Sequence, residues 1–366
     1  MSQLRGGFRS PGTGSLILIQ MPRLNQFPRL LLAEWRKLKL PISGETVVVA
    51  VSGGADSTAL LLAIQELKNY QKLYVEICVA HLDHRLRKTS AKDAKWVAAL
   101  AEKLGFRSVI GRSKVAEEAR NNSDNLEQAA REARYAFLER TAKRVSARYV
   151  LTAHTMDDQA ETVLLRLMRG SAGYGLGGME SIRSLAKNSP IKLVRPLLWA
   201  RRIETEDYCR VRKTEFLSDE MNEDQAFARV KVRKQLLPLM QSFNNRVVEA
   251  ISRTALQLRE DGSVLFNDSD ALLRRAAVSS EGNDGETEAP VLDVKVLSAA
   301  PAALRRRALR QWLSEARGSA RRLEMVHLVA VEKLLEGNAS GRVVELPGGG
   351  RVRRNRNRLE FELEND

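Results

Sequence analysis

A β-branched strand signal that runs directly into a glycine pair constrains this chain more than any other feature. Residues 46–51 read TVVVAV, residues 52–57 read SGGADS, and residues 58–67 are rich in helix formers. This pattern predicts a strand, a tight loop and a helix. The N–H groups of such a loop and the helix dipole are aimed at an anion. The segment therefore predicts a phosphate-binding loop, although an ordinary capped glycine turn would share its outline.

Three further strand signals alternate with helical signals. The strands are expected at residues 72–80, 107–110 and 149–153, and the helices begin near residues 90 and 124. Strands and helices that alternate in this way predict parallel pairing with right-handed crossovers. The expected fold class is therefore α/β, an open parallel sheet with helices on both faces, whose ligands bind at the carboxyl ends of the strands.

The rest of the chain divides by composition. The first 33 residues carry four arginines and no acid, which is typical of a transit segment or an over-long start before Met21. We expect a partly disordered leader over 1–40, an α/β domain over 41–215 and a helical linker domain over 216–280. The polar stretch 279–290 predicts a linker, and 291–366 predicts a small α+β domain.

The residues of the glycine loop have separate expected roles. Ser52, Gly53, Gly54, Ala55 and Ser57 are candidates for phosphate binding, because they offer hydroxyls and closely approaching backbone. Asp56 would repel a bare phosphate, so it is expected to hold Mg²⁺ or to face the polar edge of a nucleotide. No Gly-Lys pair occurs in the chain, which excludes a Walker A loop.

A second set of polar residues follows the last predicted strand. His154 lies at the strand end, and Asp158 and Glu161 lie on one face of the next helix. Two carboxylates on one face repel each other unless a cation lies between them, and an ammonium group would satisfy both. Acids at a helix N-terminus also favour the helix dipole, so the chemistry alone leaves both interpretations open.

These segments resemble a known family. SGGADS resembles the PP-loop of the N-type ATP pyrophosphatases, which split ATP into AMP and pyrophosphate. Within that superfamily, three segments resemble the tRNA(Ile)-lysidine synthetases: HLDHRLR at 81–87, NLEQAAREARY at 125–135 and HTMDDQAET at 154–162. The stretch 227–233 departs from the family pattern, since Val230 replaces an Asn. Met221, which lies before this stretch, is a second departure and replaces a Ser or Thr.

The resemblance implies an adenine nucleotide α hydrolase-like fold and ATP-dependent attachment of L-lysine to the wobble cytidine of the CAU-anticodon isoleucine tRNA. It implies that Arg131 lies near the ATP phosphates, that Asp158 and Glu161 bind lysine and that His154 is a catalytic candidate. The implied cofactors are ATP and Mg²⁺, with Asp56 facing either Mg²⁺ or the nucleotide. The resemblance also implies that 41–215 is the catalytic domain and that 216–280 and 291–366 bind tRNA.

The basic residues predict contacts with RNA. Lys and Arg exceed Asp and Glu to give a net charge of +15, which favours a polyanionic partner. The candidates are Arg229 and Arg233, four apart on one helix face, and Arg354 and Arg356, which with Arg358 would share one side of a strand. Solvated surface is the alternative. Because aromatic residues make up only 5%, a folded RNA fits better than an extended single strand.

Two other functions remain open from the sequence. A tRNA thiolase could share the loop, but Cys78 and Cys209 stand far apart and form no CxxC motif. A non-catalytic RNA-binding protein is the other alternative. Two cysteines fit a reducing compartment, which is the cytoplasm, or an organellar stroma or matrix if the leader is a transit peptide. No apolar run approaches a membrane span, and the oligomeric state stays open, a homodimer included.

Overall fold

The computed structural model describes residues 24–83, 85, 90–113, 126–171, 173–217, 228–278, 290–318, 322–337 and 340–363. The chain forms two units. Unit 1 comprises 1–158 and 180–224, and unit 2 comprises 159–179 and 225–366, so the chain changes unit within helix α6 (Met156–Met168). None of the helices in these ranges is long and apolar enough to cross a bilayer.

Unit 1 is built on a six-stranded sheet in the order β3-β2-β1-β4-β6-β5. Its first five strands in that order pair in parallel, and β5 joins β6 in the antiparallel direction at the edge. The strands are β1 Ser43–Ala50, β2 Tyr74–Asp83, β3 Arg107–Arg112, β4 Tyr149–Leu151, β5 Ile182–Ser184 and β6 Lys192–Val194. The predicted open α/β sheet is confirmed, with one antiparallel edge strand that the sequence did not predict.

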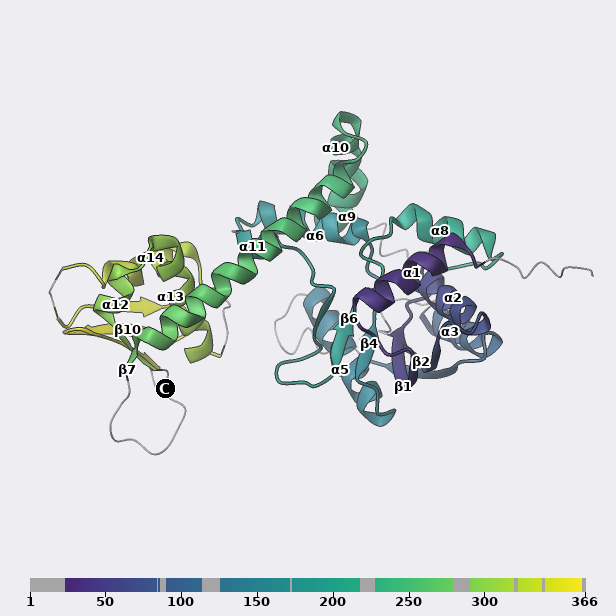
Figure 1. Cartoon of the computed structure of the whole chain (residues 1–366), viewed down its shortest axis with the longest axis horizontal. Helices are drawn as coiled ribbons and strands as arrows, with labels where there is room; N and C mark the ends of the chain where they lie inside the picture. Colours follow the sequence, from purple (N-terminus) through teal and green to yellow (C-terminus); the bar gives the residue numbers. More distant parts are fainter. Residues whose placement is uncertain are drawn as a thin grey trace, which may run out of the picture. The chain divides into compact units, whose positions relative to one another are not determined.

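Helices cover both faces of this sheet, and the side chains of β1 explain why. Val47 and Val49 are buried in the cluster that includes the helices on one face, whereas Val48 is buried in the cluster on the other. A strand buried on both faces needs apolar residues at successive positions, which residues 47–51, VVVAV, provide. The helices are α1 Gln26–Lys37, α2 Ala55–Asn69, α3 Ser90–Lys103 and α8 Arg202–Val211 with the first cluster, and α5 Leu126–Arg144 with the second (Figure 1).

Helix α1 corrects the predicted leader. Leu31 and Trp35 of α1 are fully buried, and the Trp35 indole donates a hydrogen bond to the Pro41 carbonyl at 2.9 Å. The apolar residues of α1 recur at helical spacing, so this segment packs against the core instead of forming part of a leader over 1–40. Residues 1–23 lie outside the described residues.

Unit 2 contains most of α6, several short helical segments and one long helix that leads into a small α+β body. The helical segments are α7 Gly173–Leu176, α9 Ala228–Lys231, the π-helical turn η2 Val232–Leu236, α10 Leu237–Phe243, α11 Val247–Ala276, α12 Val294–Ala299, α13 Ala302–Ala316 and α14 Met325–Lys333. Its five-stranded sheet has the order β7-β8-β11-β10-β9. The strands are β7 Ala277–Val278, β8 Val291–Asp293, β9 Val343–Leu346, β10 Gly350–Asn355 and β11 Arg358–Leu363.

The predicted domain boundary at 279–290 differs from the structure. Strands β7 and β8, on either side of that stretch, pair with each other in an antiparallel ladder. Leu272 and Leu273 at the end of α11 share one core with Trp312 of α13. The end of the predicted helical domain is therefore part of the same unit as the C-terminal sheet. Residues 279–289 themselves lie outside the described residues.

Candidate active site

The PP-loop joins β1 to α2 at the carboxyl edge of the unit 1 sheet. The Ser57 hydroxyl accepts hydrogen bonds from the N–H groups of Ser52 at 3.1 Å and Gly53 at 3.2 Å, and it lies 3.1 Å from the Ser52 hydroxyl. These bonds fold the loop back over the first turn of α2. By helix geometry the first N–H groups of α2, at Ala55, Asp56 and Ser57, have no acceptor within the helix. The loop can therefore present several N–H and O–H donors to one anion.

Gly53 is required by the shape of this loop. Its φ is +95°, in the region that favours glycine, and a Cβ there would lie 2.6 Å from Leu217 Cδ1. The Gly53 carbonyl accepts a hydrogen bond from the Leu217 N–H at 2.9 Å and another from the Thr58 hydroxyl at 3.2 Å. The segment at Leu217 thus packs directly on the loop.

His81, in the HLDHRLR segment, supports the strand that leads into the loop. It lies near the end of β2, is buried, and its Nδ1 lies 2.8 Å from the Val51 carbonyl oxygen. Burial lowers the pKa of His81, although the Val51 carbonyl and Asp83 oppose this change. The neutral imidazole donates from Nδ1 to this carbonyl, which places His81 beneath the loop. His84 of the same motif lies outside the described residues.

Asp56 lies in the first turn of α2 and has two partners from α8. The Thr205 hydroxyl donates to one carboxylate oxygen, and Arg202 Nε lies 3.5 Å from the other. Burial raises the pKa of Asp56 to about 6, Arg202 opposes this rise and Asp158 adds to it. Perturbed carboxylates at a sheet's ligand edge are candidates for functional sites.

Arg202 connects Asp56 to the acidic start of α6. Its guanidinium donates to Asp158 at 3.0 Å, so Asp56 and Asp158 approach the same cation. The Asp158 carboxylate also caps its own helix, because it accepts from the Thr155 N–H at 2.9 Å. Asp157 instead pairs with Arg201 through two hydrogen bonds of 3.1 and 3.2 Å. The structure therefore brings two of the predicted site residues together around one guanidinium.

His154 lies just beyond β4 at the same edge of the sheet. Its Nδ1 is 3.0 Å from the Thr152 hydroxyl, and the ring is half-buried. The Thr152 N–H donates to the Val194 carbonyl at 2.9 Å, which places the residues after β4 beside the end of β6. His154 is therefore at a ligand-binding edge, as its position after a parallel strand predicts.

Glu161 has a different environment from Asp158, although both lie on α6. Its carboxylate is fully buried in unit 2, and it pairs with Arg233 at 2.7 Å and Arg229 at 3.2 Å. These arginines were predicted to face RNA, and both guanidinium groups contact this carboxylate instead. Arg233 lies in the π-helical turn η2, a distortion that is frequent at functional sites. Val230 lies between them in sequence and is buried. At this departure from the family pattern, a packed apolar side chain therefore stands where the family has the amide of an Asn. Met221, the other departure, lies outside the described residues.

Arg131 lies exposed on α5, next to Tyr135. Its guanidinium carbon is 5.0 Å from the centre of the Tyr135 ring, and that of Arg183 is also 5.0 Å away. Because α5 follows a parallel strand, its first turns lie toward the carboxyl edge of the sheet. This is the side on which the resemblance predicts the ATP phosphates.

The C-terminal arginines correct a prediction. Arg354 is buried in β10 and donates to the carbonyl oxygens of Leu334 at 2.8 Å and Glu336 at 3.0 Å. Arg356 lies in the tight turn between β10 and β11, with φ of 53°, and is exposed. The expected single strand carrying residues 354, 356 and 358 is therefore wrong, because the chain reverses between them. Of the two tail candidates, only Arg356 is placed to meet RNA.

The donor set around Asp56 fits magnesium bound together with a nucleotide. Within the described residues, no three His, Cys, Asp or Glu side chains are grouped as a protein-only metal site would require. Mg²⁺ is commonly held by one or two carboxylates plus substrate phosphates. Asp56, at the loop and near Asp158, matches that mode.

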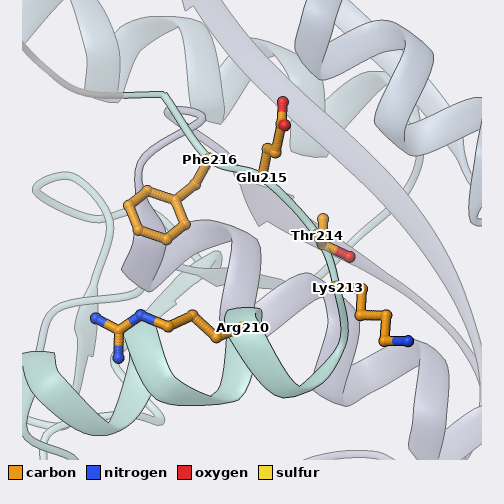
Figure 2. A pocket seen from close by; sticks show the side chains of 5 residues that line it. All are labelled: Arg210, Lys213, Thr214, Glu215 and Phe216. Atoms are coloured by element: carbon orange, nitrogen blue, oxygen red, sulfur yellow. The ribbon is translucent and has the colours of Figure 1, made fainter.

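A separate hollow of about 630 Å³ lies at the other end of α8 (Figure 2). It is lined by Arg210, Lys213, Thr214, Glu215 and Phe216. These side chains spread along the helix end and the following segment without converging on one point. None of the predicted site residues lines it, so we do not regard it as the reaction site.

Sequence reasoning missed Arg202 and Thr205. Helix α8 lies inside the domain predicted over 41–215, but none of its residues was a predicted site residue; it packs into the unit 1 core through Tyr208 and Cys209. Its first turn supplies both partners of Asp56. The basic pair at 201–202 opening a helix was the available signal, and it gave no indication of which carboxylates it would meet.

Comparisons with known proteins agree with this fold. The PP-loop domain family matches residues 31–240, and the TilS substrate binding domain family matches residues 292–360. A U34-tRNA thiolase from Methanococcus maripaludis superposes with a TM-score of 0.53 over 64% of this chain and 80% of its own, at 14% identity. At that identity the likeness supports the fold alone.

Sequence relatives extend over most of the chain. A tRNA(Ile)-lysidine synthase from Geobacter sulfurreducens is 37% identical over 87% of this chain, which spans 65% of that relative. Relatives of the same name from Gloeobacter violaceus and Rhodococcus erythropolis are 38% and 41% identical, and the chain covers 82% and 79% of them. From this coverage and identity, the chain belongs to the tRNA(Ile)-lysidine synthase family.

Proposed function

We propose that the protein ligates lysine to C2 of the wobble cytidine of the CAU-anticodon isoleucine tRNA. ATP would activate the base as an adenylated cytidine, and AMP and pyrophosphate would be released. The lysidine formed changes codon specificity from AUG to AUA and identity from methionine to isoleucine. The observation that carries the proposal is the pairing of a PP-loop with Asp56 and Asp158 around one guanidinium, in a chain of this family.

The PP-loop would hold the pyrophosphate part of ATP. Ser52 and Ser57 supply hydroxyls, and Gly53, Gly54 and Ala55 let the backbone approach the phosphate oxygens. Mg²⁺ at Asp56 would neutralise charge on the phosphates. Arg131 supplies a further positive charge for the attack of the cytosine O2 on the α-phosphorus.

Lysine would bind along α6, one turn of which carries both predicted carboxylates. The Asp158 side chain keeps 14% of its surface exposed and Glu161 none, so we assign the first contact with the ammonium group to Asp158. Glu161 would add negative charge and hold Arg229 and Arg233. The ε-amine must lose a proton before it displaces AMP at C2, and His154 is a nearby polar group at the same edge.

The tRNA would be held by basic side chains and by the C-terminal part of unit 2. The match of residues 292–360 to the TilS substrate binding domain family supports this role of unit 2. Within these residues, Arg356 is exposed at a turn. Arg229 and Arg233, which pair with Glu161, would contribute positive charge toward the RNA. We place the reaction in the cytoplasm, where both buried cysteines would stay reduced.

A test of the activation step measures AMP and pyrophosphate production from ATP with no lysine added. We expect both products only when an isoleucine tRNA transcript with a wobble cytidine is present, and none after Asp56→Ala. A transcript with uridine at that position is the matched control. Binding of the transcript without any AMP would contradict the proposal and support a non-catalytic RNA-binding protein. Sulfur transfer would support a thiolase.

A further inference from the structure

Three arginines of unit 1 gather around one tyrosine at the edge of the sheet. Arg131 and Tyr135 lie on α5, Arg183 lies in β5, and Arg195 follows β6. The guanidinium groups of Arg131 and Arg183 each lie 5.0 Å from the ring centre. Arg183 and Arg195 also interact electrostatically with the Tyr135 hydroxyl. We call these four residues the Tyr135 cluster.

Arg195 is the buried member of this cluster. Its side chain is 2% exposed, and one guanidinium nitrogen donates to the Glu180 carbonyl at 2.5 Å. Its Nε is buried and has no hydrogen-bond partner among the described residues. A buried guanidinium with an unused N–H is costly unless a ligand completes its bonding.

The charge of the cluster is not balanced by the protein. None of the carboxylates in the described ranges pairs with Arg131, Arg183 or Arg195, and Arg183 donates to the main-chain carbonyls of Ser184 and Leu185 at 2.7 and 3.3 Å. Burial alone would raise the pKa of Tyr135, yet the three arginines together lower it. Burial lowers the pKa of Arg195, and Arg183 and Arg131 add to this change. The lowered pKa of Tyr135, against the effect of burial, indicates an excess of positive charge that an anion would relieve.

The strand members of the cluster, Arg183 and Arg195, lie away from the PP-loop. Strand β6 is the second neighbour of β1, and strands in a sheet lie roughly 4.8 Å apart, so the cluster's strands are about 10 Å or more from the loop's strand. A pyrophosphate held at the PP-loop lies beside β1. An anion at Arg183 and Arg195 is therefore a second phosphate, beyond the ATP phosphates to which Arg131 is assigned, on the side of the sheet where β4 and α6 place His154 and Asp158.

We propose that the Tyr135 cluster binds a backbone phosphate of the RNA substrate, next to the nucleotide that is modified. Arg183 and Arg195 would contact the phosphate oxygens through their planar N–H groups. Tyr135 holds the guanidinium groups of Arg131 and Arg183 in place through its ring face. This assignment rests on the proposed function, because it takes the RNA to be the substrate.

The test compares RNA and ATP binding in the full-length protein. The variant Arg183→Gln removes a half-buried charge from the cluster, and Arg140→Gln removes an exposed charge from the same helix as Tyr135. We expect Arg183→Gln to raise the Kd for an anticodon stem-loop RNA about tenfold and to reduce the salt slope by about one. The Kd for a non-hydrolysable ATP analogue and all values for Arg140→Gln should stay at the wild-type level. Thermal unfolding checks the fold, and Arg183→Lys, which keeps the charge, should lose less affinity.

A set of stem-loop RNAs, each with one neutral methylphosphonate linkage, locates the phosphate. One linkage should weaken binding to the wild type, and the same RNA should lose no further affinity with Arg183→Gln. The assignment is overturned if no linkage shows this coupling, or if the variant weakens ATP binding in place of RNA binding. A wild-type protein that binds no RNA overturns this assignment and the proposed function together. If the wild type forms lysidine normally but Arg183→Gln shows no coupling to any neutral linkage, this assignment is overturned and the proposed function stands.

Discussion

Replacement of Asp56 by Asn should stabilise the folded protein at neutral pH while it ends the reaction. Burial raises the pKa of Asp56 from 3.8 to about 6, so the fold disfavours the charged carboxylate. A rise of about two pKa units corresponds to about 3 kcal/mol of unfolding free energy. Because the Asp56 side chain keeps 22% of its surface exposed, solvent screening reduces the expected gain to about 2 kcal/mol.

The sign of the pH dependence follows from proton binding. Between the unfolded pKa of 3.8 and the folded pKa of about 6, the folded protein binds more protons at Asp56 than the unfolded chain does. The contribution of Asp56 to the unfolding free energy therefore falls as the pH rises through this window, and it stays low above it. The Asn variant has no such dependence, so its advantage grows with pH.

Urea unfolding of both proteins, from pH 4 to pH 7.5, measures this difference. The advantage of Asp56→Asn should be close to zero at the acidic end and about 2 kcal/mol at the neutral end. Asp157→Asn is the matched control, since Asp157 pairs with Arg201 through two hydrogen bonds; it should destabilise the fold by about 2 kcal/mol at neutral pH. An Asn variant of Asp56 that is less stable than the wild type at neutral pH would refute the reasoning.

Three further predictions concern other parts of the chain. Glu161→Gln should lower the unfolding free energy by about 3 kcal/mol, because it leaves two arginines beside a buried amide. The same variant should raise the KM for lysine. Unchanged denaturation and unchanged lysine kinetics would contradict both roles. Gly53→Ala should weaken ATP binding at least tenfold in titration calorimetry, since its φ is +95° and the new Cβ meets Leu217; wild-type affinity would show that the loop tolerates a side chain. Arg354→Gln should lower the melting temperature with little change in the salt dependence of RNA binding, whereas Arg356→Gln should do the opposite, and equal effects in both assays would contradict the burial difference.

The sheet and its phosphate loop could be predicted because their signals are local. The run before Ser52 is rich in β-branched and apolar residues, and the glycine pair that follows permits the tight turn that Gly53 adopts. The position of His154 at a strand end followed from the same alternation of strands and helices. Short-range patterns of this kind specify which element forms and which edge a residue reaches.

The partners of these residues could not be predicted, because they are distant in sequence. Thr205 is 149 positions from the Asp56 that it contacts, and Arg233 is 72 from Glu161. The local sequence around a basic residue on an amphipathic helix does not indicate which carboxylate it will contact. The same holds for Arg354 and Arg356. The chain reverses in a two-residue turn after Asn355, so Arg354 is buried in the strand and Arg356 is exposed in the turn.

The central claim is tested most directly by the transfer of lysine itself. The protein is incubated with ATP, Mg²⁺, radiolabelled lysine and the CAU-anticodon isoleucine tRNA transcript, and label that stays on the RNA after alkaline treatment is counted. Alkali removes an ester-linked lysine but leaves lysidine intact. We predict stable, ATP-dependent label that disappears when the wobble cytidine is replaced. RNA that binds but carries no alkali-stable label would contradict the account.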